Sequence, residues 1–310
     1  MTLNRQRRGL LRGVAAGLTL PAWWGTSGLQ AQTAAPVLQR VADGLHLVTG
    51  AGGNVVLHKG ERGLTVVDSG TAAHSAALLT LIDEVAAGAP LHTLFNTHWH
   101  SDHTGGNEAL RARGANIVAH ENTKLWLGAE FEVYWRDESH QPRPPEAWPD
   151  TTFYSGGSLD LGTESAEYQH PVQAHTDGDA WLYFPNSNVL VLGGLMSDGS
   201  YPITDIATGG WIGGLIDANA AILEKFDDDT LLVPERGPVR SMADLRAQHA
   251  MLDDVYTRMK ALAQDGHSAQ EMLDAKVTAA HDASWGDPTR FVVETYMGMA
   301  MHTYDMGGFI

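Results

Sequence analysis

One histidine-rich segment contains the residues best suited to bind a metal ion. His98, His100, Asp102 and His103 all fall within Thr97–Asn107, a segment that continues into two adjacent glycines. Neutral imidazole nitrogens and carboxylate oxygens are ligands that suit zinc. Because alternate residues of a tight loop can turn inward together, His98 and His100 can share one ion, while Asp102 and His103 point to a neighbouring position. The spacing therefore favours a metal centre over a solvated histidine-rich loop.

The elements around this segment place it directly after a strand. We expect a strand over Leu91–Phe95 and a helix over Glu108–Arg113, with the glycines allowing the sharp turn between them. Four short β-rich runs separated by Gly and Asp-Gly signals come earlier, followed by a helical stretch over Thr71–Ala87. After the helix, the proline- and aromatic-rich stretch Phe131–Tyr154 is expected to be a long loop, which is often a functional element.

The second half of the chain repeats this order of strands and helices. Strands are predicted over Ser158–Leu161, Glu164–Gln169, Ala180–Phe184, Val189–Leu192 and Leu231–Val233. Helices are predicted over Trp211–Phe226 and from Ser241 to about Gln264, the latter opening in the manner of a capping box. The alternation predicts one domain, residues 37–310, with two sheets flanked by helices in an α/β sandwich.

The pattern His-x-His-x-Asp-His-x-Gly-Gly resembles the signature of the metallo-β-lactamase superfamily, and the order of elements resembles that family over nearly the whole mature chain. The resemblance implies an αββα sandwich with the metal loops at one edge of its two sheets. Ala51–Asn54 is similar to the family's early strand and flap. His175, within Ala174–Asp179, is similar to the histidine of the family's His-Thr-x-Gly loop. By resemblance, His98, His100 and His175 form the first metal site.

The second metal site of the family is only partly matched. Gly194 stands where the resemblance implies an aspartate that bridges two metals, and Arg236 stands where it implies a histidine ligand. Arginine stays protonated and does not bind zinc. We therefore expect one tightly bound zinc and a second site, left with Asp102 and His103, that is weak or absent. Asp198 is the one nearby carboxylate that could substitute.

These residues give two hypotheses for function. The first is a hydrolase in which a zinc-activated water attacks an ester, amide, lactone or thioester carbonyl of a small-molecule substrate. Asp102 would orient that water or take its proton, and Arg236 would reach into the vacated second site to pair with Asp102 or to hold substrate charge. The second is a periplasmic pseudoenzyme or binding protein that retains the fold and one zinc. The aromatic loop around Tyr134 and Trp135 is expected to act as a lid or to pack locally.

Composition limits the remaining classes of function. The 310 residues include no cysteine, which excludes disulfides and thiolate zinc sites. Lys and Arg total 20 against 37 Asp and Glu, and this net charge of -17 makes nucleic acid a poor partner.

The N-terminus is predicted to be a signal peptide over residues 1–31, because a basic stretch precedes a short apolar run and small residues. Arg7 and Arg8, followed by Gly9, two leucines and Arg12, resemble the twin-arginine export motif. The resemblance implies a bacterial protein that the twin-arginine machinery exports to the periplasm, with no stable membrane insertion after cleavage. An ordinary secretory signal is the alternative.

Overall fold

The computed structural model describes residues 35–162 and 164–302. The predicted signal peptide, residues 1–31, lies outside the described residues, so the export prediction is untested. Residues from Ala35 onward cluster as one compact unit. Across the described ranges, none of the helices combines the length and the apolar character needed to cross a membrane.

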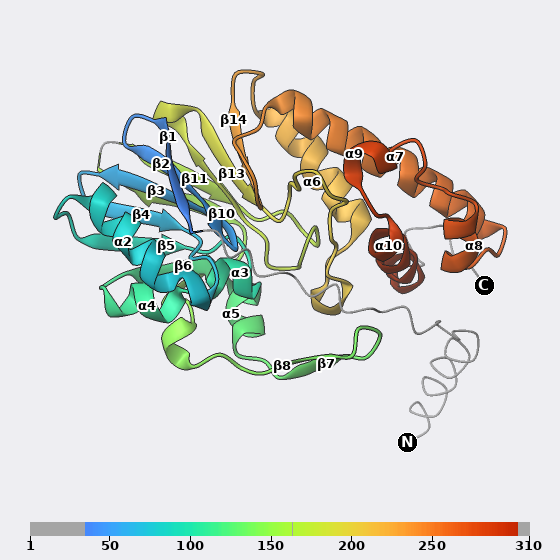
Figure 1. Ribbon diagram of the computed structural model, residues 1–310, viewed down its shortest axis with the longest axis horizontal. Coiled ribbons are helices and arrows are strands. Elements are labelled where there is room, and N and C mark those ends of the chain that lie inside the picture. The colour runs from blue at the N-terminus through green and yellow to red at the C-terminus, as the bar shows by residue number, and fades with distance from the viewer. Residues whose placement is uncertain (1–34, 163, 303–310) are drawn as a thin grey trace. The chain divides into compact units, whose positions relative to one another are not determined.

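Two sheets form the centre of the fold (Figure 1). The first has seven strands in the order β1 (Val37–Ala42), β2 (Leu45–Ala51), β3 (Gly53–Gly60), β4 (Gly63–Val67), β5 (Leu91–Phe95), β6 (Asn116–His120) and β9 (Thr151–Phe153). The second has five strands in the order β10 (Gly156–Asp160), β11 (Ser165–Gln169), β12 (Trp181–Phe184), β13 (Val189–Gly193) and β14 (Leu231–Pro234). The pairs β4–β5, β5–β6, β6–β9 and β13–β14 are parallel, and the other pairs are antiparallel.

Central strands such as β4 and β13 bury both of their faces, so successive apolar residues belong to different cores. In β5, Phe95 packs between the two sheets, whereas Leu94 packs on the opposite face beneath the helices. In β13, Val191 packs between the sheets and Leu192 faces the other helical layer. Because side chains alternate across a strand, these near-continuous apolar runs generate three stacked cores. The predicted αββα sandwich is confirmed.

Helices cover the outer faces of both sheets. On the first sheet they are α2 (Ser75–Ala86) and α4 (Asn107–Ala112), whose residues Leu78 and Leu110 enter the outer core. On the second sheet they are α6 (Ile212–Lys225), α7 (Met242–Gln264) and α10 (Thr289–Met301), with the short α8 (Ala269–Asp274) and α9 (Asp282–Trp285) between the last two. The capping box at Ser241 is present: the Asp244 carboxylate accepts from the Ser241 backbone N–H, and the Ser241 hydroxyl accepts from the Asp244 backbone N–H.

The stretch Phe131–Tyr154 differs from the loop that the sequence predicts. It contains a two-stranded hairpin of β7 (Phe131–Val133) and β8 (Glu138–His140), the 3-10 turn Pro145–Ala147 and the edge strand β9. The prolines of this stretch lie between β8 and β9, where turns and irregular backbone tolerate the missing backbone donor.

The parallel pairs decide where loops converge. The loops after β4 and β5 leave the same edge of the first sheet, and those after β13 and β14 leave the same edge of the second. The backbone N–H of Asn54, at the start of β3, donates to the carbonyl of Glu235, just beyond β14, at 2.8 Å. This contact joins the two edges at the histidine-rich segment.

Candidate metal centre

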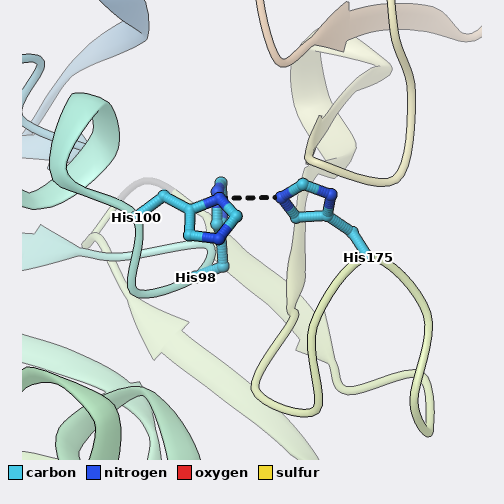
Figure 2. A group of neighbouring side chains, drawn as sticks. All are labelled: His98, His100 and His175. Carbon is cyan, nitrogen blue, oxygen red and sulfur yellow. Dashed lines mark hydrogen bonds between the residues drawn. The ribbon is translucent and has the colours of Figure 1, made fainter. Parts of the chain in front are cut away.

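Three histidines from two distant loops meet at the joined sheet edges. His98 and His100 follow β5 and His175 lies between β11 and β12, and the three present ligand nitrogens within 4.8 Å of one another. Figure 2 shows the imidazole of His175 facing those of the other two across the gap between the loops. His98 and His175 are buried, whereas the side chain of His100 is 21% exposed. The set that the resemblance implies as the first metal site is therefore assembled.

Hydrogen bonds on the outer nitrogens of His100 and His175 fix where their protons lie. The Nδ1 atom of His175 is 2.7 Å from the carbonyl oxygen of Ile203, which can only accept. The Nε2 atom of His100 is 3.1 Å from a carboxylate oxygen of Asp205. Both outer nitrogens must donate, so in the neutral rings the lone pairs lie on His175 Nε2 and His100 Nδ1. These two atoms are 3.0 Å apart, the distance of a hydrogen bond that forms when one of the rings is protonated (Figure 2).

His98 completes this set with the same polarity. Its Nδ1 atom lies 3.0 Å from the Thr97 hydroxyl, whose proton is donated to Asp68 at 2.7 Å. The hydroxyl can therefore only accept from His98, which leaves His98 Nε2 with a lone pair. That nitrogen is buried and has no hydrogen-bond partner among the described residues. Burial and the neighbouring histidines and Arg236 hold the pKa of His98 well below its usual value.

With all three rings neutral, three lone pairs converge, and a proton or a metal ion between them is needed to hold the nitrogens this close. A metal-binding histidine usually donates from its other ring nitrogen to an oxygen acceptor, which fixes the tautomer of the ring. The carbonyl, carboxylate and hydroxyl oxygens beside these three histidines are acceptors of this kind. The donor chemistry of His98, His100 and His175 thus fits a metal ion.

A second group of ligands lies beside the first and includes one residue that sequence reasoning missed. Asp102, His103 and Glu235 also place ligand atoms within 4.8 Å of one another. His103 is buried and donates from Nδ1 to Asp68 at 2.7 Å, while its Nε2 atom is buried without a hydrogen-bond partner. Burial opposes charge on this ring, but Asp68 and Asp102 outweigh it and raise the pKa of His103 to about 9. The carboxylates therefore favour a positive charge at this position.

Arg236 already places a positive charge in the second group. Its guanidinium is paired with Asp102 through Nη2 and lies 3.4 Å from Glu235 through Nε. The pairing with Asp102 is the one expected from the sequence. Burial acts against the ionised form of Asp102, but His103 and Arg236 hold its pKa below the usual range. The side chain of Arg236 is 46% exposed and so also reaches solvent.

Two further acidic residues support these groups. Asp68, at the end of β4, accepts from the Thr97 backbone and hydroxyl and from His103, so it orients ligands of both groups. Asp205, buried after β13, accepts from His100 and pairs with Arg136 at 3.0 Å. The position of Asp68 after a buried strand could have indicated it from sequence, whereas nothing in the local sequence singles out Asp205.

Gly194 and Asp198 explain why no further carboxylate enters the second group. A Cβ atom at Gly194 would lie 2.2 Å from Cδ2 of His175, so the histidine ring occupies the space of a side chain there. Asp198, the candidate substitute, instead pairs with Arg240. The second group therefore has Glu235 as its additional acid.

The aromatic residues near the site mostly pack against one another. Trp99, Phe131 and His140 form a cluster with ring centroids 4.5–5.7 Å apart. Tyr134, at the turn of the β7–β8 hairpin, is 82% exposed. This loop was expected either to act as a lid or to pack locally. Its residues Phe131 and His140 pack locally, whereas Tyr134 at the turn is exposed to solvent.

Comparison with known sequences decides the family. The sequence model of the metallo-beta-lactamase superfamily matches residues 48–240, which include all ligands of both groups. The chain belongs to the metallo-beta-lactamase superfamily. Its helices α7 to α10 follow the matched region.

Two curated relatives match short parts of the chain. The 2,4-dinitroanisole O-demethylase subunit alpha of Nocardioides sp. (strain JS1661) is 33% identical over 105 residues, 33% of this chain and 28% of that protein. The hydroxyacylglutathione hydrolase of Erythrobacter litoralis (strain HTCC2594) is 27% identical over 109 residues, 35% of each chain. The chain thus spans about a third of the length of these relatives.

Solved structures of the superfamily share the fold. The metallo-beta-lactamase from Pontibacter korlensis is 19% identical with a TM-score of 0.57, covering 71% of this chain and 99% of that one. The DIM-1 metallo-beta-lactamase is 17% identical with a TM-score of 0.57, covering 71% and 98%. A double mutant of the sec-alkyl sulfatase PisA1 is 16% identical with a TM-score of 0.66, covering 88% of this chain and 51% of that one. At these identities the likeness concerns architecture.

Proposed function

We propose that this member of the metallo-beta-lactamase superfamily is a zinc-dependent hydrolase acting on a small-molecule ester, amide, lactone or thioester. The observation that carries the proposal is the convergence of three imidazole lone pairs from His98, His100 and His175, each fixed by an outer hydrogen bond. Three neutral histidines are the ligand set of catalytic zinc sites that keep a position open. A zinc ion held there would lower the pKa of a coordinated water toward neutrality.

The residues beside the three histidines serve the attack on a carbonyl. Asp102 lies next to His103 on the same short segment and carries a carboxylate that can accept a hydrogen bond from the attacking water. Its orientation is held by Arg236, whose guanidinium also extends to solvent. From there Arg236 can donate to a substrate carboxylate or to the developing oxyanion, where fixed charged donors act most strongly.

A binding protein that retains the fold and one zinc is the second candidate. The observation in its favour is that Arg236 occupies one carboxylate oxygen of Asp102, which would otherwise contact water. The two candidates differ in turnover but not in zinc content.

Zinc content and turnover of the purified protein test the proposal together. We expect about one zinc per chain after dialysis and hydrolysis of at least one member of a panel of esters, lactones, thioesters and a chromogenic β-lactam. The names of the curated relatives add a glutathione thioester and an aryl methyl ether to the panel. Zinc without turnover would favour the binding protein, and a chain without zinc would refute both candidates.

Arg236 provides a sharper test of the chemistry. Arg236→Ala should lower kcat by about 10²-fold, the scale of one lost oxyanion donor, while Arg236→Lys should retain part of the activity because it keeps charge without the fork geometry. Arg240→Ala is the matched control, since Arg240 forms its own pair with Asp198 outside both ligand groups. Equal activity of the two alanine variants would remove Arg236 from the mechanism.

We also propose export to the periplasm by the twin-arginine machinery, which would allow the zinc to be loaded before export. The support is the sequence Arg7-Arg8-Gly9-Leu10-Leu11-Arg12 alone. Replacing Arg7 and Arg8 by lysine should leave the precursor in the cytoplasm in a cell-fractionation assay. An unchanged periplasmic yield would indicate the ordinary secretory route.

A further inference from the structure

The second ligand group contains one more candidate metal ligand, Glu235, than the resemblance left at this site. Asp102 and Glu235 contribute two carboxylates, with side chains only 20% and 14% exposed. His103 contributes Nε2, which is fully enclosed, has no hydrogen-bond partner among the described residues and lies 3.6 Å from Asp102. A buried imidazole nitrogen directed at two carboxylates is a donor set for a divalent cation such as zinc.

Hydrogen bonds fix these donors in place. His103 is oriented by Asp68, through the carboxylate–histidine contact typical of metal ligands. The backbone of Glu235 is held on both sides, because its carbonyl accepts from Asn54 at 2.8 Å and its N–H donates to Met196 at 2.9 Å. The Asn54 side chain also donates to the carbonyl of Pro234 at 2.9 Å. Glu235 is therefore held beside His103 rather than on a mobile loop.

The Arg236 guanidinium gives this group a permanent positive charge. It contacts both carboxylates, Asp102 through Nη2 and Glu235 through Nε, and no other arginine or lysine forms an ion pair with either of them in the described part of the chain. A guanidinium and a divalent ion bound to the same oxygens would repel each other and compete for the same lone pairs. Occupancy by Arg236 and by a metal should be mutually exclusive.

We propose that Asp102, His103 and Glu235 form a latent second metal site that the Arg236 guanidinium keeps closed. The site differs from the two-metal arrangement that the resemblance implied, because its extra acid comes from Glu235 rather than from position 194. The inference concerns the same region as the proposed function, and it rests on that function only in assuming that the first site holds one zinc.

The test is zinc stoichiometry and affinity of the purified full chain, measured by elemental analysis and calorimetry, with zinc as the probe. Wild-type protein should retain one zinc per chain after dialysis. Arg236→Met, which keeps the side-chain stem without the charge, should retain two, with the second bound at least tenfold more tightly than any second zinc in the wild type. The double variant Arg236→Met with Glu235→Gln should return to one, and Arg240→Met should behave as wild type.

Each result distinguishes the two proposals. A zinc content in Arg236→Met no higher than in the wild type, or two zincs in the wild type, would overturn the latent site. Two zincs in the double variant would exclude Glu235 as a ligand and would overturn it as well. If the wild type holds none and Arg236→Met gains one that Glu235→Gln removes, the latent site stands and the proposed zinc hydrolase fails. Thermal unfolding of each variant, measured in parallel, checks that the fold is retained.

Discussion

The two groups of candidate ligands lie side by side but differ in charge. The first consists of His98, His100 and His175, whose outer nitrogens donate to neighbouring groups and whose inner nitrogens offer lone pairs when the rings are neutral. The second contains two carboxylates and already includes the Arg236 guanidinium. On the proposals above, a metal-ligand motif alone does not decide metal binding, because the charge of the residue nearest to the ligands also contributes.

Removing one histidine from each group gives the largest expected difference. His98→Ala should abolish zinc binding and turnover, since two imidazoles and water make a poor site. His103→Ala should retain the first zinc, because its ring belongs to the other group. Elemental analysis of both variants measures this, and equal zinc loss would show that the groups act as one unit.

Two glycines allow the comparison to be made without changing a ligand. A Cβ atom at Gly194 would lie 2.2 Å from His175, and one at Gly53 would lie 2.5 Å from His103. Neither glycine has a positive φ, so an alanine would be excluded by space rather than by backbone conformation. Gly194→Ala should therefore weaken zinc binding by more than about 100-fold, the upper range for disturbing a ligand's support. Gly53→Ala should leave the first zinc in place, and zinc affinity by competition with a chelator separates the two.

The smallest expected effect concerns the outer support of the first group. Asp205→Asn should lower zinc affinity about 10-fold to 100-fold, because the amide no longer provides a charged acceptor for His100 Nε2. Asp198→Asn is the matched control, since Asp198 pairs with Arg240 and contacts neither group. If both variants bound zinc as tightly as the wild type, the assignment of the His100 proton would be wrong.

The strands and most helices could be predicted because their signals are local. The runs Leu91–Phe95 and Val189–Leu192 are continuous and apolar, which suits strands buried on both faces, and the structure contains them as β5 and β13. The hairpin β7–β8 was not predicted, because strands of three residues carry too little pattern to separate from a loop. Helix α10 was likewise not predicted.

The sequence predicted an α/β sandwich from its alternation of strands and helices and the pair His98 and His100 from ligand spacing, because both patterns are properties of neighbouring residues. The αββα arrangement and His175 came from the resemblance of the motifs to the metallo-β-lactamase superfamily. The pairing of Arg236 with Asp102 was one of two roles expected for an arginine that reaches into the vacated second site, and it is present. Tertiary structure alone decided that Glu235 joins the second group, that Asp205 holds His100 and that Asp198 is taken by Arg240. These contacts depend on how close the loops of the two sheets come to one another at one edge. The packing of the strands sets the distance between those loops, and no local stretch of sequence specifies it.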